Sequence, residues 1–141
     1  MSDGAEPRVA QILLVEDNPA DVRMIDIALR AIDFPHVLHV VDNGENALAF
    51  LRQDEPYAKA PRADMVLLDL ALPRLNGHRV LEEIDKDAQL RNVPVVVLSG
   101  SKRDPDVDRA YGLGVNAYII KPVGLRAYID EMNIVRQLVA I

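Results

Sequence analysis

Residues 65–73 read Met-Val-Leu-Leu-Asp-Leu-Ala-Leu-Pro, an apolar run interrupted by a single acid, Asp69. A short apolar run bounded by turn signals is typical of a strand that is buried on both faces, as in a parallel sheet. A charged carboxylate left unpaired in such a strand is costly. We therefore expect Asp69 to lie beside a cation, or where the strand reaches the carboxyl edge of the sheet, in the crevice where ligands bind.

The chain has 141 residues, no cysteine and a formal net charge of −6. This length suits one domain that can bury a core without disulfides or structural metals. The acidic balance argues against nucleic-acid binding, which needs a basic face. The sequence shows neither a signal-peptide pattern nor an apolar run near the ~18 residues of a membrane span. We expect a cytoplasmic protein that does not enter the membrane, with a flexible tail over residues 1–9 and one domain over residues 10–141.

Apolar runs and helical patterns alternate five times along the chain. The expected strands are Gln11–Val15, His36–Val41, the 65–73 stretch, Val93–Leu98 and Asn116–Ile120. The expected helices cover about 19–33, about 45–53, a segment through 80–84 that ends near 88, about 104–112 and about 124–139. This alternation predicts the α/β class: a doubly wound, five-stranded parallel sheet with helices on both faces. We expect the flavodoxin-like strand order 2-1-3-4-5.

Polar side chains stand at the ends of four of these strands. Glu16 and Asp17 follow the first strand, Asp69 and Ser99 end the third and fourth, and Lys121 follows the fifth. The carboxyl ends of parallel strands meet at one edge of the sheet, so the three carboxylates should repel one another there. A hard cation such as Mg²⁺ would relieve this repulsion, since it takes oxygen ligands and is often shared between carboxylates and phosphate. With Lys121 and Ser99 holding the remaining phosphate oxygens, the pattern predicts a phosphoryl site.

Most of these residues also have an ordinary structural explanation. Glu16 and Asp17 can complement the dipole of the following helix, Ser99 can be a turn residue, and Lys121 can be surface charge. Asp69 is harder to explain, because an acid is rarely needed inside an apolar strand. The convergence of five positions on one sheet edge favours a functional site.

On the basis of these residues, the chain resembles response-regulator receiver domains over about residues 10–140. The motif residues occur in the order of that family: Glu16-Asp17, Asp69, Ser99, Tyr118 and Lys121-Pro122. The resemblance implies that a sensor histidine kinase donates a phosphoryl group to the carboxylate of Asp69. The protein would then be no ordinary enzyme, but a phosphoacceptor that catalyses its own phosphorylation and dephosphorylation.

The resemblance also implies a metal site. Asp17 and Asp69 would bind Mg²⁺ directly, together with the backbone carbonyl of Ala71, and Glu16 would act through a water molecule. Ala71 departs from the family pattern, because the residue two positions after the acceptor is often polar and helps to place the hydrolytic water. The carbonyl of Ala71 can still bind metal, so on this resemblance the departure bears on the lifetime of the phosphoryl group and not on phosphorylation itself.

Three further residues receive roles from the resemblance. Lys121 would pair with the phosphoryl group, Ser99 would move toward it, and Tyr118 would turn inward as a switch. The Lys121-Pro122 peptide bond would be cis, a form that occurs mainly at Xaa-Pro bonds.

The sequence ends with the fifth helix, so we expect the signal to leave through the surface of the receiver itself. The segment Asn18–Asp21, the loop Arg52–Arg62 and the stretch Pro-Val-Val-Val-Leu-Ser resemble the stand-alone regulators that partner bacterial phytochrome kinases. Met24 and Ile27 lie off the core stripe of the first helix, and the hypothesis is that they dock the kinase.

In the last helix, Ile134, Leu138 and Ile141 lie opposite the predicted core stripe, and the hypothesis is that they form a homodimer surface. Scattered apolar residues are also common on protein surfaces. The core stripe itself is expected to be Leu125, Tyr128, Ile129, Met132, Val135 and Val139.

Other functions are weighed against the receiver. The fold could be a phosphorylation-independent binding module, or a phosphate sink in a relay. A haloacid-dehalogenase-like phosphatase would need a second acid where Ala71 stands, and a flavodoxin would need a hydroxyl-rich phosphate loop after the first strand. His36, His39 and His78 lack metal-ligand spacing and are expected to pack or face solvent.

Overall fold

The computed structural model describes residues 9–72, 75–100 and 104–139, and strands and helices alternate through this part of the chain. The strands are β1 (Ala10–Val15), β2 (His36–Val41), β3 (Met65–Asp69), β4 (Val95–Ser99) and β5 (Ala117–Ile120). The helices are α1 (Pro19–Ala31), α2 (Gly44–Arg52), α3 (Gly77–Lys86), α4 (Asp104–Gly112), α5 (Leu125–Val135) and the short 3₁₀ helix η1 (Arg136–Leu138).

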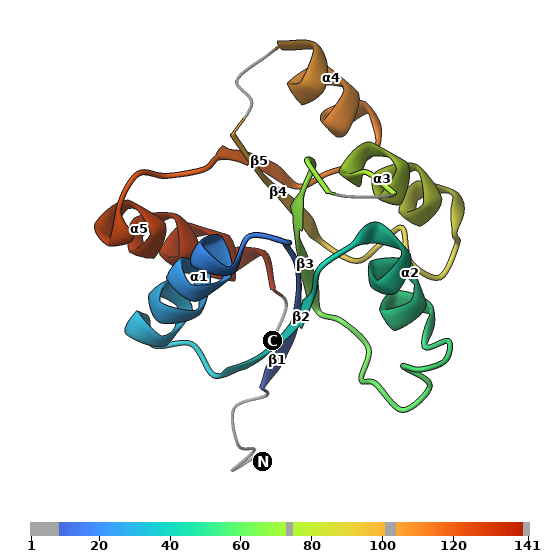
Figure 1. The fold of residues 1–141 in the computed structure, drawn as a ribbon, viewed down its shortest axis with the longest axis horizontal. Helices are drawn as coiled ribbons and strands as arrows, with labels where there is room; N and C mark the ends of the chain where they lie inside the picture. Colours follow the sequence, from blue (N-terminus) through green and yellow to red (C-terminus); the bar gives the residue numbers. More distant parts are fainter. Residues whose placement is uncertain (1–8, 73–74, 101–103, 140–141) are drawn as a thin grey trace.

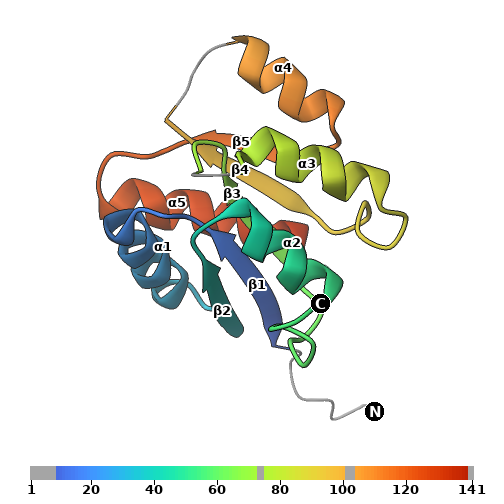
Figure 2. The ribbon, with the colours of Figure 1, turned by 45° about the vertical axis from the view of Figure 1, so that its right-hand side comes forward.

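The five strands form one parallel sheet in the order β2-β1-β3-β4-β5, which confirms the predicted fold class and strand order. Helices α1 and α5 cover one face of the sheet, and α2, α3 and α4 lie on the other (Figure 1). Figure 2 shows the same division from a second direction, with α1 directly beside α5.

The three central strands are buried on both faces, which explains their continuous apolar sequences. Alternate side chains point to opposite sides of the sheet. In β3, Val66 and Leu68 join the core beneath α2 and α3, whereas Met65 and Leu67 join the core beneath α1 and α5. The sequence of β3 therefore tolerates a polar residue only at its end, where Asp69 lies.

Three helices begin with an asparagine cap directly after a strand or its connecting loop. Asn18 Oδ1 accepts hydrogen bonds from the backbone N–H of Ala20 at 2.9 Å and of Asp21 at 3.4 Å. Asn43 and Asn76 cap α2 and α3 in the same way. Such caps satisfy free N–H groups of the first helical turn and fix where each helix leaves the carboxyl edge of the sheet.

Gly77 is required where α3 begins. A Cβ atom at this position would contact Leu70 Cα and would lie 2.7 Å from the carbonyl oxygen of Asp69. The backbone N–H of Gly77 also donates a hydrogen bond to the carbonyl of Leu70 at 3.0 Å. The absence of a side chain thus lets α3 start against the end of β3, beside Asp69.

Three sequence-based expectations are wrong in detail. The last helix ends as an α-helix at Val135 and tightens into η1, and Leu125, expected in the core, is 37% exposed. In the described residues the cis peptide bond is Glu55-Pro56, and Lys121-Pro122 is not cis. It thus has the form that most Xaa-Pro bonds adopt. None of the helices within the described ranges is long and apolar enough to cross a membrane.

Candidate functional site

Three acids come together at the carboxyl edge of the sheet. Carboxylate oxygens of Glu16, Asp17 and Asp69 all lie within 4.8 Å of one another. The register that pairs Val15 of β1 with Leu68 of β3 leads directly to this arrangement, because Glu16 and Asp69 are the next residues along the two neighbouring strands. Glu16 and Asp69 are buried and Asp17 is exposed, so the cluster opens to solvent on one side.

The ammonium group of Lys121 lies inside the acidic cluster. Its Nζ is 3.2 Å from Asp69 Oδ2, 3.1 Å from Glu16 Oε2 and 2.8 Å from Asp21 Oδ2. The lysine is held in place by its backbone as well, since its N–H donates to the carbonyl of Ser99 at 2.7 Å. The predicted cation beside Asp69 is therefore Lys121.

Asp69 is fixed at both carboxylate oxygens. Its Oδ1 accepts the backbone N–H of Ala71 at 3.0 Å, and its Oδ2 accepts a hydrogen bond from Lys121. The side chain of Asp69 is 5% exposed. These contacts orient a carboxylate that is otherwise removed from water.

The electrostatics of the site reflect an excess of negative charge. Burial and the negative charge of Asp69 together raise the pKa of Glu16 to about 7, against the opposing effects of Lys121 and the N–H of Asn18. Burial alone would lower the pKa of Lys121, but its contacts with Asp21, Asp69 and Glu16 hold that pKa above its ordinary value. The lysine is thus charged, and its single positive charge is shared among three carboxylates, those of Glu16, Asp21 and Asp69.

These residues fit a hard divalent cation. Glu16 Oε2 is buried and forms no hydrogen bond with the described residues, although it lies near the lysine. Clustered carboxylate oxygens of this kind are the ligands that Mg²⁺ and similar ions prefer. A bound cation would lower the mutual repulsion that Lys121 alone relieves only in part. The carbonyl of Ala71 stays a predicted ligand.

Ser99 and Tyr118 lie on the neighbouring strands. Ser99 is the last residue of β4 and is 4% exposed, and its neighbour Leu98 pairs in register with Asp69. Tyr118 of β5 is partly buried and packs against the core beneath α2 and α3. The structure therefore brings Ser99 to the same edge as Asp69, and it places Tyr118 one strand further out.

The sequence-based predictions missed Asp21 and the hydroxyl of Tyr128. Asp21 lies in the first turn of α1 and contacts Lys121, while the hydroxyl of Tyr128 on α5 donates to Asp21 Oδ1 at 3.3 Å. One signal was available, because Asp21 lies in the first turn of the helix that directly follows the acidic pair Glu16-Asp17. The hydroxyl of Tyr128, a predicted core residue, would also be expected to find a polar partner.

The residues expected to dock the kinase and those expected to form a homodimer differ in exposure. Met24 and Ile27 are only partly exposed, and Met24 packs against the core. Ile134 is 62% exposed and Leu138 is 36% exposed, as the hypothesis of a dimer surface requires, whereas Ile141 lies outside the described residues.

The histidines without metal-ligand spacing have ordinary surroundings. The ring of His36 stacks on that of Phe34. The Nε2 atom of His39 is 2.7 Å from Gln11 Oε1, and its ring packs at a tilt against that of Phe50. Burial lowers the pKa of His39.

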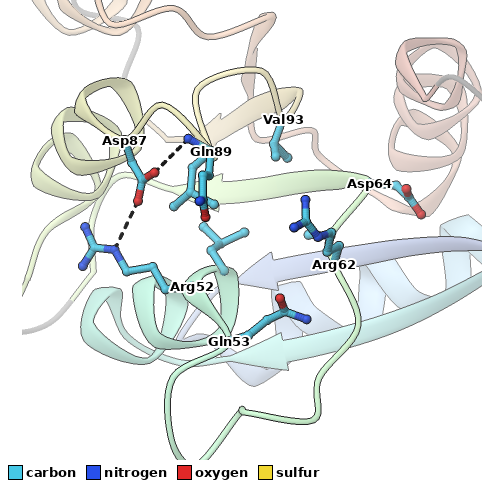
Figure 3. Close-up of a pocket in the computed structure, with 10 residues that line it drawn as sticks. Arg52, Gln53, Arg62, Asp64, Asp87, Gln89 and Val93 are labelled. Atoms are coloured by element: carbon cyan, nitrogen blue, oxygen red, sulfur yellow. Dashed lines mark hydrogen bonds and ion pairs between the residues drawn. The ribbon is translucent and has the colours of Figure 1, made fainter.

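A cavity of about 250 Å³ lies at the opposite edge of the sheet, between the end of α2 and the segments that precede β3 and β4. Figure 3 shows Arg52 beside Asp87 at one side of this cavity and Arg62 at the other. Arg52 Nε lies 3.6 Å from Asp87 Oδ2. The cavity is separate from the acidic cluster, since its lining residues precede the strands that end at the cluster. The site is therefore identified by its side chains and not by this cavity.

The chain is similar to known proteins over most of its length. The family model for the response regulator receiver domain matches residues 12–133. The chain is 41% identical over 126 residues to response regulator Rcp1 of Synechocystis sp., covering 89% of this chain and 85% of Rcp1. Among solved structures, the phosphorylated cyanobacterial phytochrome response regulator RcpA aligns with a TM-score of 0.86 at 42% identity, covering 92% of this chain and 93% of RcpA. The Mn²⁺-bound form of Rcp1 aligns with a TM-score of 0.84 at 38% identity, covering 91% and 92%.

Proposed function

Because this chain belongs to the response-regulator receiver family, we propose that it accepts a phosphoryl group on Asp69 from a sensor histidine kinase and relays the signal through protein contacts. One observation carries the proposal: the buried Asp69 carboxylate belongs to an acidic cluster that could hold a metal ion, and it contacts the ammonium group of Lys121. A binding module that works without phosphorylation would gain nothing from these buried charges, which are costly to fold around.

The proposed reaction is a simple displacement. A carboxylate oxygen of Asp69 attacks the phosphorus atom of a phosphohistidine, the P–N bond breaks, and the imidazole leaves with its electron pair and takes up a proton. Mg²⁺ held by Asp17 and Asp69, with Glu16 acting through water, would supply charge neutralisation for the phosphoryl oxygens. Lys121 neutralises a further oxygen, and the hydroxyl of Ser99 donates to another. Positioning and charge neutralisation are the main requirements of such a transfer.

We propose that the kinase is of the bacterial phytochrome class and docks on α1 near Met24 and Ile27. Support comes from the relatives, since RcpA is a phytochrome response regulator, and from the position of α1 directly after the acidic pair. An open groove lined by Asp17, Pro19 and Val22 runs from the acidic cluster along this helix. This groove reaches Glu16 and Asp17, two acids of the cluster that contains Asp69, so a helix that docks on α1 would lie beside the site. We further propose that the protein acts in the cytoplasm, where such kinases have their transmitter domains.

The test is incubation of the protein with Mg²⁺ and acetyl phosphate, followed by intact mass spectrometry. We expect one phosphoryl adduct on the wild type and none on Asp69→Asn. Asp33→Asn is the matched control, because Asp33 is an exposed acid in the turn after α1 and should not affect the adduct. The proposal fails if the wild type gains no adduct or if Asp69→Asn keeps it.

A further inference from the structure

Asp21 bridges the phosphoacceptor site and the pair of helices beside it. Its Oδ2 accepts a hydrogen bond from Lys121 at 2.8 Å, and its Oδ1 accepts one from the hydroxyl of Tyr128 at 3.3 Å. The Asp21 contact is the shortest that Lys121 makes with any of its three carboxylate partners. Tyr128 is 3% exposed, so its hydroxyl reaches Asp21 from within the packed interface of α1 and α5.

Asp21 differs from the other two partners of Lys121. Glu16 and Asp69 belong to the group of acids that can hold a metal ion, and a bound cation would weaken their attraction for the lysine. Asp21 is not a member of that group and would keep its full attraction. Its side chain is 22% exposed, so its contact with Lys121 is only partly screened by solvent.

A phosphoryl group on Asp69 would compete with Asp21 for the ammonium group of Lys121. A phosphoryl group adds about 1.5 to 2 negative charges, and on Asp69 it would need a nearby cation. Lys121 already donates to Asp69 Oδ2 at 3.2 Å, so a phosphoryl group on that carboxylate would compete with Asp21 for the same ammonium group. An additional carboxylate near the phosphoryl group also opposes its charge directly.

We propose that Asp21, held by Tyr128, is a positioning residue that retains Lys121 on the α1 side of the site and releases it when Asp69 is phosphorylated. This inference rests on the proposed function. Asp21 lies on α1 and Tyr128 on α5, which are neighbours in Figures 1 and 2. The release therefore links phosphorylation to the α1–α5 pair, independently of Ser99 and Tyr118 on the opposite side of the site.

The test uses beryllium fluoride, which with Mg²⁺ mimics a phosphoryl group on a carboxylate, and measures its binding by ¹⁹F NMR. Asp21→Asn keeps the shape of the side chain and an acceptor for Tyr128 but removes the charge that holds Lys121. We expect it to bind beryllium fluoride about 5- to 10-fold more tightly than wild type, within the usual range of coupling between sites. Tyr128→Phe should shift binding in the same direction by about 2-fold, because Asp21 loses one restraint.

Asp26→Asn is the matched control. Asp26 lies on the same helix and pairs with Arg30 on the exposed surface, so this variant removes the same charge without touching Lys121. Asp21→Glu should return binding toward the wild-type value, because the carboxylate is restored. Circular dichroism of each variant verifies that the fold is kept.

A double-mutant cycle separates release of Lys121 from a general effect of charge. In the Lys121→Met background, Asp21→Asn should change beryllium fluoride binding no more than Asp26→Asn does. The inference is overturned if Asp21→Asn matches Asp26→Asn in the wild-type background, or if its effect persists without the lysine. Failure of the proposed function looks different, since then neither acetyl phosphate nor beryllium fluoride would distinguish wild type from Asp69→Asn.

Discussion

The carboxylate of Glu16 lies 3.1 Å from the ammonium group of Lys121, yet the glutamate side chain is 1% exposed and has a pKa raised to about 7. Burial and the neighbouring Asp69 thus outweigh the attraction of the lysine. Between the ordinary pKa of 4.5 and about 7, the folded protein binds a proton that the unfolded chain has lost. Linkage then requires that this glutamate lower the stability of the fold as the pH rises through that window.

Glu16→Gln should therefore stabilise the metal-free protein at pH 8, by about 1–2 kcal/mol in the free energy of unfolding. The gain should disappear near pH 4.5, because the folded wild-type protein then carries a protonated, neutral Glu16, which is as uncharged as the glutamine of the variant. Urea unfolding followed by circular dichroism at both pH values measures this. Glu45→Gln, at an exposed position in the first turn of α2, is the control and should show no comparable gain at pH 8. A Glu16→Gln protein that is less stable than wild type at pH 8 would show that the ion pair with Lys121 outweighs burial.

Removal of Asp17 should weaken metal binding with little cost to the fold, because this acid of the cluster is exposed. We expect Asp17→Asn to lower Mg²⁺ affinity at least about 10-fold, because the ion would lose one of its few charged ligands. The measurement is the rise in unfolding temperature with Mg²⁺ concentration, since a ligand that binds only the folded state stabilises it. Asp33→Asn should keep the wild-type response. Equal responses of the two variants would exclude Asp17 as a ligand.

Gly77→Ala should disturb the site through the backbone. The added methyl group would press on Leu70 and on the carbonyl of Asp69, which belong to the segment that carries the acceptor. Overpacking of this kind costs about 1–3 kcal/mol, and the displacement should reduce phosphorylation of Asp69 by acetyl phosphate. Gly112→Ala is the control, because a Cβ there meets no atom within 4 Å. Normal stability and phosphorylation of Gly77→Ala would mean that the start of α3 yields without moving Asp69.

The sequence was sufficient for the fold because its signals are local. Continuous apolar runs such as that of β3 occur where a strand is buried on both faces, and the asparagine caps mark where the following helices begin. The acidic cluster was predictable for a related reason. Each of its residues ends or follows a strand, and all parallel strands end at the same edge of the sheet.

Asp21 and Tyr128 could not be placed in the same way, because their meeting depends on how α1 packs against α5. Helical periodicity correctly assigned Tyr128 to the core, where its side chain is 3% exposed. Periodicity does not predict which polar group the hydroxyl of Tyr128 contacts. Periodicity also placed Leu125 in the core, although it lies at the first position of α5. A residue in the first turn can project beyond the edge of the sheet that the rest of the helix covers.

The exposed side of α5 and η1 provides the last prediction, which concerns a homodimer through Ile134 and Leu138. Ile134 lies on α5 and Leu138 on η1, and they are 62% and 36% exposed, so both leave apolar surface open on the C-terminal segment. If they form a dimer surface, the double variant Ile134→Glu, Leu138→Glu should be monomeric by multi-angle light scattering at a concentration where the wild type is dimeric. Val123→Glu is the control, because Val123 is 96% exposed and lies before α5. The free energy of unfolding of the isolated monomer should change by less than about 0.5 kcal/mol, as for other surface substitutions. A wild type that is monomeric throughout, or a double variant that keeps the dimer mass, contradicts the hypothesis.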